Sequence, residues 1–553
     1  MLANTVTYLL FIAIFSLLRF RPKFDKFIIA GLTVACLWVF NRFCLDWQLV
    51  TESITTLVWD SSKSGDVKID IVSNRYNYML IFPFFVITLL SLLNNLLFKF
   101  EDKKRIFSAI LILNLLSLIL LISTTNLVGI ITFVFVIDIL SQFFINNTYA
   151  SRRYSIYNLI ADMGLFMIMA MLKGKLDNLE IGNIAHYYET GRHRDFIMFA
   201  VIISLFIKFG FFLFQSYLLD LKNTKFHKLI LILYLSTPMV ALILLMKLYP
   251  LLVVSPSFDL CLNIILALTM FWGTIGTIVA NNLKEKTVYL NMMLISMVVK
   301  LLQGVDFVFD IHLALVLIAC FVLNLCLYYV HYYVGRENNL YAVEKVSKTG
   351  ICITLCAYII TSVAFLSELS LLVTDLNLIW VDVFIGLFII ASAHIFSQIL
   401  YLKDKQKLGF DFYPLFILCI CTFGALYIIK TTGLWWLYIF AFVISFLVMV
   451  KIYPLRFVLY NKLLNAKLQK IDFFAHFYDV LIVNPIKIIG RWLTVLFDFM
   501  FIEKTLTAMF SSLNGFTIRI FRKSARHWAI YYLFNVIVAM VVVLWCFFKG
   551  DKQ

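Results

Sequence analysis

Charged residues are scarce in this sequence of 553 residues: Asp, Glu, Lys and Arg make up 14% of it, against roughly 25% in soluble domains. Hydrophobic residues reach 63%, and the mean hydropathy is +0.95. No soluble core could absorb that apolar excess, so lipid must contact much of the chain. The composition therefore excludes a soluble protein and predicts one that crosses a membrane.

Motifs for metal, cofactor or nucleophile chemistry are also missing. The ten cysteines form no CxxC pair and no Cys/His metal spacing, and most lie inside apolar runs, where cysteine acts as a small apolar residue. No Walker loop, dinucleotide-binding glycine motif or Ser/His/Asp set is visible. We expect no cofactor and no metal, and any redox or hydrolytic activity would have to reside in another chain.

The net charge of +16 could suggest a nucleic-acid-binding protein, but the positions of the basic residues exclude that class. Lys and Arg are spread over many short loops and are not gathered on one domain. Cytoplasmic loops of membrane proteins concentrate positive charge. This bias explains the basic residues without nucleic acid as a partner.

Apolar runs long enough to cross a bilayer, which takes about 20 helical residues, recur along the whole chain. The first run, at 6–18, has no basic leader and no small-residue cleavage site, so we expect a retained helix. By the same length criterion the sequence predicts about sixteen transmembrane helices, at residues 5–18, 27–43, 78–98, 106–123, 127–145, 155–172, 195–214, 228–252, 258–280, 287–303, 311–334, 346–366, 377–402, 413–429, 434–453 and 528–548.

The loops between these runs alternate in charge. Every second loop carries clustered Lys and Arg, as at 19–26, 99–105, 152–153, 222–228, 284–286, 336–348 and 403–407. The intervening loops are poor in net positive charge, although the loop at 173–195 is mixed. Since positively charged loops stay in the cytoplasm, the N-terminus is predicted to lie outside it.

Residues 455–526 are too charged to span a membrane but keep apolar residues at helical spacing. Phe473, Phe477 and Leu481, with Lys487 and Arg491 following, predict an amphipathic lateral helix along the membrane surface. The alternative is an ordinary cytoplasmic tail, which the many aromatic residues disfavour.

Ionisable residues inside or close to predicted spans are candidates for function, because a charge in the membrane is costly. They are Asp138, Asp162, Lys208, Lys300, His312 and Asp375. The first three come from successive spans, and a carboxylate stabilises a buried ammonium, so we expect them to share a dry compartment in which Lys208 exchanges a proton. The plainer alternatives are snorkelling for Lys208, a helix–helix hydrogen bond for Asp162 and an interfacial position for Lys300.

Five stretches resemble motifs of a known family in the same order along the chain. They are VKIDIVSNRYNYML at 67–80, NLIADMGLF at 158–166, IKFGFFLFQSYLLDL at 207–221, NNLKEKTVYLNMMLISMV at 281–298 and HFYDVLIVNPIKIIGRWL at 476–493. The family is that of the antiporter-like subunits of respiratory complex I, above all the large distal subunit (NADH-quinone oxidoreductase chain 5, or chain L), with the related A-type subunits of multisubunit sodium/proton antiporters. The first of these stretches resembles the start of the family's third helix. The resemblance implies that Lys208 is the family's key lysine, that Asp162 lies on its proton path, and that His312 and Asp375 belong to a second path.

The chain also departs from the family's pattern. Phe135 stands where the family has a glutamate, and Asp138, three residues on and hence on the same helix face, is the expected substitute. In the second half of the chain, one histidine and two lysines of the family are replaced by Val316, Cys320 and Thr374. The first half-channel is thus largely kept, whereas the second has lost its lysines, with Lys300 as a candidate replacement.

The expected fold is an all-α polytopic membrane protein with a lateral helix. The resemblance implies a bacterial inner-membrane location and two inverted five-helix repeats, the second one degenerate. The parts expected along the chain are N-terminal helices (1–105), the two repeats (106–252 and 258–402), additional helices (403–454), the lateral helix (455–527) and a terminal helix (528–553).

Three functions remain open at this point. The first is proton translocation as one membrane subunit of a complex I-like NADH-quinone oxidoreductase, driven by partner subunits. The second is a subunit of a multisubunit cation/proton antiporter, which sodium-dependent activity would distinguish. The third is a non-pumping structural subunit with a decayed channel, which the missing lysines favour. Each requires other membrane subunits and the lipid bilayer as partners.

Overall fold

The structure is a computed structural model, and the part of the chain that it describes ends, apart from three residues, at residue 400. The described part, apart from Ile488, belongs to one compact unit, Met1–Lys467. Because the description ends near residue 400, the predicted elements beyond residue 402, including the lateral helix at 455–527, lie outside the described residues. The described residues are 2–17, 25–48, 53–60, 67–97, 104–145, 147–173, 181, 184, 194–253, 255, 257–280, 282–305, 310–334, 345–373, 379–400, 406–407 and 488.

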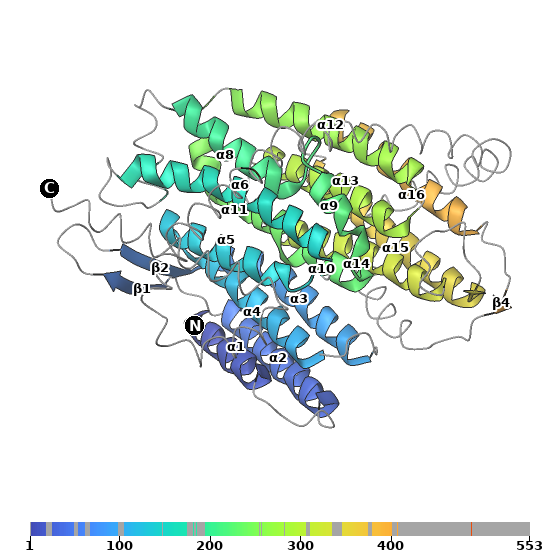
Figure 1. Ribbon diagram of the computed structural model, residues 1–553, viewed down its shortest axis with the longest axis horizontal. Helices are drawn as coiled ribbons and strands as arrows, with labels where there is room; N and C mark the ends of the chain where they lie inside the picture. The colour runs from blue at the N-terminus through green and yellow to red at the C-terminus, as the bar shows by residue number, and fades with distance from the viewer. Residues whose placement is uncertain are drawn as a thin grey trace. The chain divides into compact units, whose positions relative to one another are not determined.

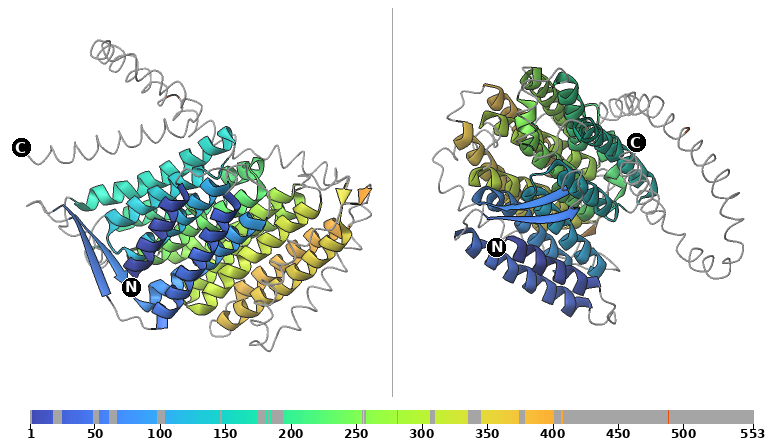
Figure 2. Two further views of the ribbon diagram at one scale, coloured as in Figure 1. Left: turned by 90° about the horizontal axis from the view of Figure 1, so that it is seen from below. Right: turned by 90° about the vertical axis from the view of Figure 1, so that its left-hand side faces the viewer.

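Helices make up nearly all of the described part and lie roughly side by side in one bundle (Figures 1 and 2). Their bounds are α1 Leu2–Leu17, α2 Asp25–Gln48, α3 Arg75–Leu97, α4 Lys104–Ser123, α5 Leu127–Gln142, α6 Thr148–Lys173, α8 Arg194–Phe209, α9 Ser216–Asp220, α10 Phe226–Leu235, α11 Thr237–Leu252, α12 Ser257–Val279, α13 Leu283–Gly304, α14 Ile311–Tyr333, α15 Lys348–Val373 and α16 Ile379–Leu400, with a 3-10 turn at Leu221–Asn223. The strands are β1 Ser53–Asp60, β2 Val67–Ser73, β3 Lys345–Val346 and β4 Gln406–Lys407.

Eight segments of the described part are long and apolar enough to cross a membrane, and four shorter apolar helices accompany them. The chain is therefore a helical, multi-pass membrane protein. Each span predicted up to residue 402 coincides with a helix, although two of these spans are interrupted. Hydropathy locates such helices well because every backbone polar group inside a bilayer must be bonded within its own segment.

The segment Phe226–Leu252 lies at the centre of the bundle. An apolar stretch of 18 residues in it is wholly buried in protein, whereas only 44% of the corresponding stretch in Ser257–Val279 is buried. On α12 the exposed residues Leu260, Ile264, Leu268 and Phe271 recur at helical spacing. Such a stripe fits contact with lipid tails. The central segment instead packs against helices on all sides, which places its polar groups away from lipid.

A β-hairpin joins α2 to α3. Strands β1 and β2 pair antiparallel with Ser53 opposite Ser73 and Thr56 opposite Asp70, and β2 contacts the end of the bundle where α3 begins and α4 ends (Figure 2). No strand was expected at 67–73, the stretch that precedes the span predicted at 78–98. The strand follows from β-branched residues alternating along VKIDIVS, a pattern that favours extended backbone.

Two predicted spans are broken where the bundle is most buried. The span at 195–214 ends as a helix at Phe209, and the backbone then turns through Gly210 and Leu213, both with positive φ. The span at 228–252 splits at Ser236, because Pro238 has no N–H and its ring clashes with the carbonyl of the preceding turn. Membrane helices tolerate such breaks only where protein or a polar cavity surrounds them.

Helices α6 and α8 approach each other closely at Gly164. A Cβ atom added there would lie 2.1 Å from Ser204 Oγ and 3.3 Å from the carbonyl oxygen of Ala200. We expect Gly164→Ala to destabilise the protein by about 1–3 kcal/mol through overpacking, against a gain of about 1 kcal/mol in helix propensity. Thermal unfolding in detergent measures the change. Adding Ser204→Ala removes the clash, so the double variant should regain the lost stability; if it does not, the close approach is not the cause.

Candidate functional site

The end of α8 places Lys208 inside the bundle. The lysine lies in the last turn of the helix, one residue before the helix ends at Phe209. Gly210 adopts φ +64°, and a Cβ atom there would lie 2.2 Å from Leu218, so only glycine fits. The carbonyl end of α8 carries the negative end of its dipole, which stabilises a cation in the last turn. The helix break thus sets both the position and part of the electrostatics of the ammonium.

Lys208 Nζ lies between the carboxylates of Asp138 on α5 and Asp162 on α6. It donates a hydrogen bond of 2.7 Å to Asp138 Oδ2. It also lies 2.8 Å from Asp162 Oδ1, an ion-pair distance without the angles of a hydrogen bond. The exposed fractions are 0% for Lys208, 4% for Asp138 and 3% for Asp162. We call these three residues the Lys208 triad; the expected contact is confirmed, and snorkelling of Lys208 is excluded.

The charges of the triad do not cancel when all three groups are ionised. Two carboxylates and one ammonium leave one negative charge in excess. Asp138 Oδ1 accepts no hydrogen bond from any described residue, and a buried charge is costly unless it is paired and hydrogen-bonded. The triad therefore has a place for one more positive charge, which a proton on either carboxylate or a small cation supplies. That is the chemistry of an exchange site.

Tyrosines of α6 and α9 surround the triad. Tyr217 donates a hydrogen bond of 2.9 Å to the carbonyl oxygen of Lys208, which satisfies one of the free carbonyls at the end of α8. Its ring stacks on Tyr157 at 5.1 Å and meets Tyr154 edge-on at 5.9 Å. The backbone at Lys208 is thus held by a packed aromatic group that comes from a neighbouring helix and from the chain just beyond the break.

The remaining predicted site residues lie apart from the triad or outside the described part. Lys300 donates hydrogen bonds to Asn263 Oδ1 at 2.6 Å and Gln303 Oε1 at 2.8 Å near the end of α13, and it is 8% exposed. His312 begins α14 and pairs through Nδ1 with Glu368 Oε2 at 2.8 Å. Asp375 falls in the stretch 374–378, outside the described residues. Lys300 and His312 thus make separate contacts and do not form one site.

Several polar residues that the sequence pattern assigned to loops are buried in helices. Glu368 is 2% exposed inside α15, although the span predicted at 346–366 ends before it. Lys284 and Lys286, treated as loop cations, lie in the first turns of α13 and donate to the carbonyl oxygens of Thr224 and Thr277. A signal was present for Lys284, because Asn282 is a good helix N-cap residue two positions earlier.

Lys247 on α11 is a half-buried cation that the sequence prediction missed, although it lies inside a predicted span. Its ammonium donates to the carbonyl oxygen of Thr124, which follows α4. That carbonyl comes from the end of the bundle opposite the basic loops. An ionisable residue within an apolar run was the signal that could have found it.

The described residues offer no metal site: no group of three or more His, Cys, Asp or Glu side chains is placed to hold a metal ion among them. Comparison with known proteins adds no family assignment. No family model matches the sequence, and no curated protein matches it. The resemblance of the motifs therefore stays an expectation, and the geometry of the Lys208 triad is the basis for function.

Proposed function

We propose that this chain translocates protons across the membrane, with Lys208 as the residue that holds and releases the proton. The observation that carries this proposal is a wholly buried ammonium at 2.7 and 2.8 Å from two carboxylates on different helices. Intramembrane chains of ionisable residues are typical of proton relays, and binding sites beside interrupted helices near mid-membrane are typical of secondary transporters.

The excess negative charge suggests how the exchange works. A proton that reaches Asp138 or Asp162 neutralises one carboxylate and weakens its attraction for Lys208. The ammonium then pairs with the remaining carboxylate alone, and a shift of α8 relative to α5 and α6 separates the charges. When the pair separates, the lysine loses the stabilisation of its charged form and gives up a proton.

The resemblance of the motifs supports a finer proposal: a membrane subunit of a complex I-like NADH-quinone oxidoreductase, with two inverted five-helix repeats and a degenerate second path at His312 and Asp375. Redox drive then comes from partner subunits. The runner-up is a subunit of a multisubunit cation/proton antiporter, favoured by the same excess charge, because Na⁺ balances it as well as a proton does.

The test is reconstitution of the full chain, with whatever membrane proteins co-purify, into liposomes that contain a pH-sensitive dye. An imposed membrane potential should drive proton uptake that depends on Lys208. Uptake that is the same with and without Na⁺, together with co-purifying quinone-reducing subunits, supports the first assignment. Counterflow of Na⁺ supports the second. If potential-driven proton uptake does not exceed that of empty liposomes, the proposal fails. A non-pumping structural subunit is then the remaining candidate function.

A further inference from the structure

Three buried asparagines converge on the break between α10 and α11, defined here as residues 234–237. Asn114 of α4 donates through Nδ2 to the carbonyl oxygen of Leu235 at 2.8 Å. Asn158 of α6 donates to Thr237 Oγ1 at 3.5 Å. Asn324 of α14 donates to the hydroxyl of Tyr234 at 2.5 Å. Three different helices thus direct an amide group at this stretch, one at its backbone and two at its side-chain hydroxyls.

The cause of this convergence is local. Pro238 interrupts the helical hydrogen bonds, and the N–H groups of Met239 and Val240 both bond to the carbonyl of Ser236. The carbonyl of Leu235 is then free for the side chain of Asn114. A free backbone carbonyl in a membrane costs several kcal/mol, so a partner from another helix is required.

The other half of each amide has no such partner. The Oδ1 atoms of Asn114, Asn158 and Asn324 accept no hydrogen bond from any described residue, while these side chains are 0%, 2% and 0% exposed. Nearly all buried polar atoms in proteins are satisfied, and ordered water is the usual donor where protein is not. Three unpartnered acceptors around one break therefore point to bound water as the ligand of this place.

On one side, Tyr154 of α6 leads from the break toward the Lys208 triad. The hydroxyl of Tyr154 contacts Thr237 Oγ1, and Tyr154 also lies within hydrogen-bonding range of Ser236. The ring of Tyr154 meets that of Tyr217 edge-on at 5.9 Å, and the Tyr217 hydroxyl donates to the carbonyl oxygen of Lys208. Tyr154 thus links the break to the aromatic group that holds the backbone at Lys208.

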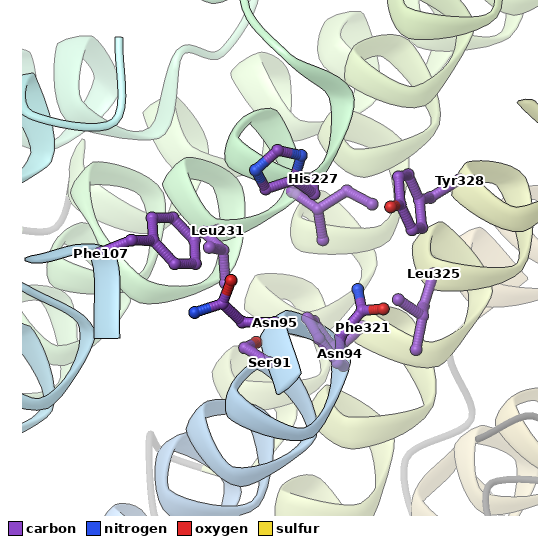
Figure 3. A pocket seen from close by; sticks show the side chains of 10 residues that line it. Ser91, Asn94, Asn95, Phe107, His227, Leu231, Phe321, Leu325 and Tyr328 are labelled. Carbon is purple, nitrogen blue, oxygen red and sulfur yellow. The ribbon is translucent and has the colours of Figure 1, made fainter. Parts of the chain in front are cut away.

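On the other side a small cavity with a mixed polar and apolar lining lies toward the start of α10, at the predicted cytoplasmic end (Figure 3). Its polar lining comes from Ser91, Asn94, Asn95, His227 and Tyr328. The space for centres of water molecules is about 20 Å³, whereas one water needs roughly 10–15 Å³.

The cavity and the break lie along the same helices. Ten residues separate His227 from Thr237, which is roughly 15 Å of helix, or half of the hydrocarbon core. Asn324 lies one turn from Tyr328 on α14. The cavity and the break therefore follow each other along the same two helices.

We propose that the break between α10 and α11 is a water-binding site, and that this water relays protons between the cavity at the start of α10 and Asp138. Each bound water accepts one proton from the cavity side and donates one on the Asp138 side, so no atom other than the proton is transferred. The binding of water rests on the three amides alone. The relay rests on the proposed function.

Radiolytic labelling of the purified full-length protein tests the water site, because X-rays form hydroxyl radicals from bound water next to the residues that it touches. Leu235 and Leu242 are a matched pair, both 0% exposed on the same predicted span. We expect Tyr234 and Leu235 to be oxidised several times faster than Leu242. Equal rates for the two leucines overturn the proposal, whatever transport shows.

Proton uptake into liposomes tests the relay. Asn324→Leu keeps the side-chain size and removes both polar atoms, and we expect it to slow uptake about tenfold, the equivalent of about 1.4 kcal/mol. Asn158→Leu, on another helix, should act in the same direction. The control is Ser117→Ala, since the Ser117 hydroxyl bonds only within its own helix, to the carbonyl of Leu113.

The outcomes separate the two proposals. Unchanged uptake in both asparagine variants, with Lys208-dependent uptake in the wild type, overturns the relay and leaves the proposed function standing. If the wild type shows no uptake but Leu235 is still labelled faster than Leu242, the proposed function fails and the water site stands.

Discussion

Replacing Lys208 with methionine is expected to reduce potential-driven proton uptake by about 100-fold or more, the range in which a positioned proton-transfer group contributes. Methionine keeps the length and most of the volume of the side chain but carries no proton. Without the ammonium, Asp138 and Asp162 are left as two adjacent carboxylates. Two carboxylates that share a site repel each other when both are ionised, so one of them keeps a proton. The two carboxylates then keep this proton and no longer exchange it.

The matched control is Lys222→Met. Lys222 pairs with Glu285 at 2.6 Å and its side chain is 38% exposed, so its loss removes a partly solvated ion pair of small energetic value. Uptake should stay at the wild-type level in this variant. Uptake that survives in Lys208→Met, or falls equally in both variants, shows that Lys208 is not the carrier.

The helices up to residue 400 and the composition of the Lys208 triad could be predicted from the sequence. Both follow from one physical cause, which is the high cost of polar groups in hydrocarbon. That cost keeps apolar runs long, and it makes a lysine or aspartate inside such a run stand out. The pairing of Asp138 with Lys208 could be expected because residues on successive spans of a bundle are usually neighbours in space.

The helix breaks were harder to predict, because apolar residues continue through them. Apolar residues lie on both sides of Ser236 and of Gly210. Only Pro238 signals the break at Ser236. The hairpin was missed because 53–73 is short and resembles a simple connection between spans. Asn114, Asn158 and Asn324 carry no charge and therefore gave no signal; their role depends on a convergence of three helices that only the structure shows.

Neutralising both aspartates is expected to have the largest effect on stability. The double variant Asp138→Asn/Asp162→Asn leaves a buried ammonium with no carboxylate beside it, and neutralising a lysine at pH 7 costs about 5 kcal/mol. We expect the midpoint of thermal unfolding in detergent to fall by roughly 5–10 °C. The buried Cys36, Cys320 and Cys326 allow a thiol-reactive dye to report the transition.

Charge balance predicts a different result for each related variant. Either single variant, Asp138→Asn or Asp162→Asn, leaves one carboxylate with one ammonium and should unfold close to the wild-type temperature, because the excess negative charge has been removed. Adding Lys208→Met to the double variant removes the stranded cation and should restore most of the lost stability, as replacing a buried ion pair by apolar groups commonly does. If the triple variant is as unstable as the double, the loss comes from packing around the two introduced amide groups and not from the unpaired ammonium. If the stability of the triad depends on the number of its charges in this way, one added or removed proton shifts the balance between the helices. Proton translocation at Lys208 requires this coupling.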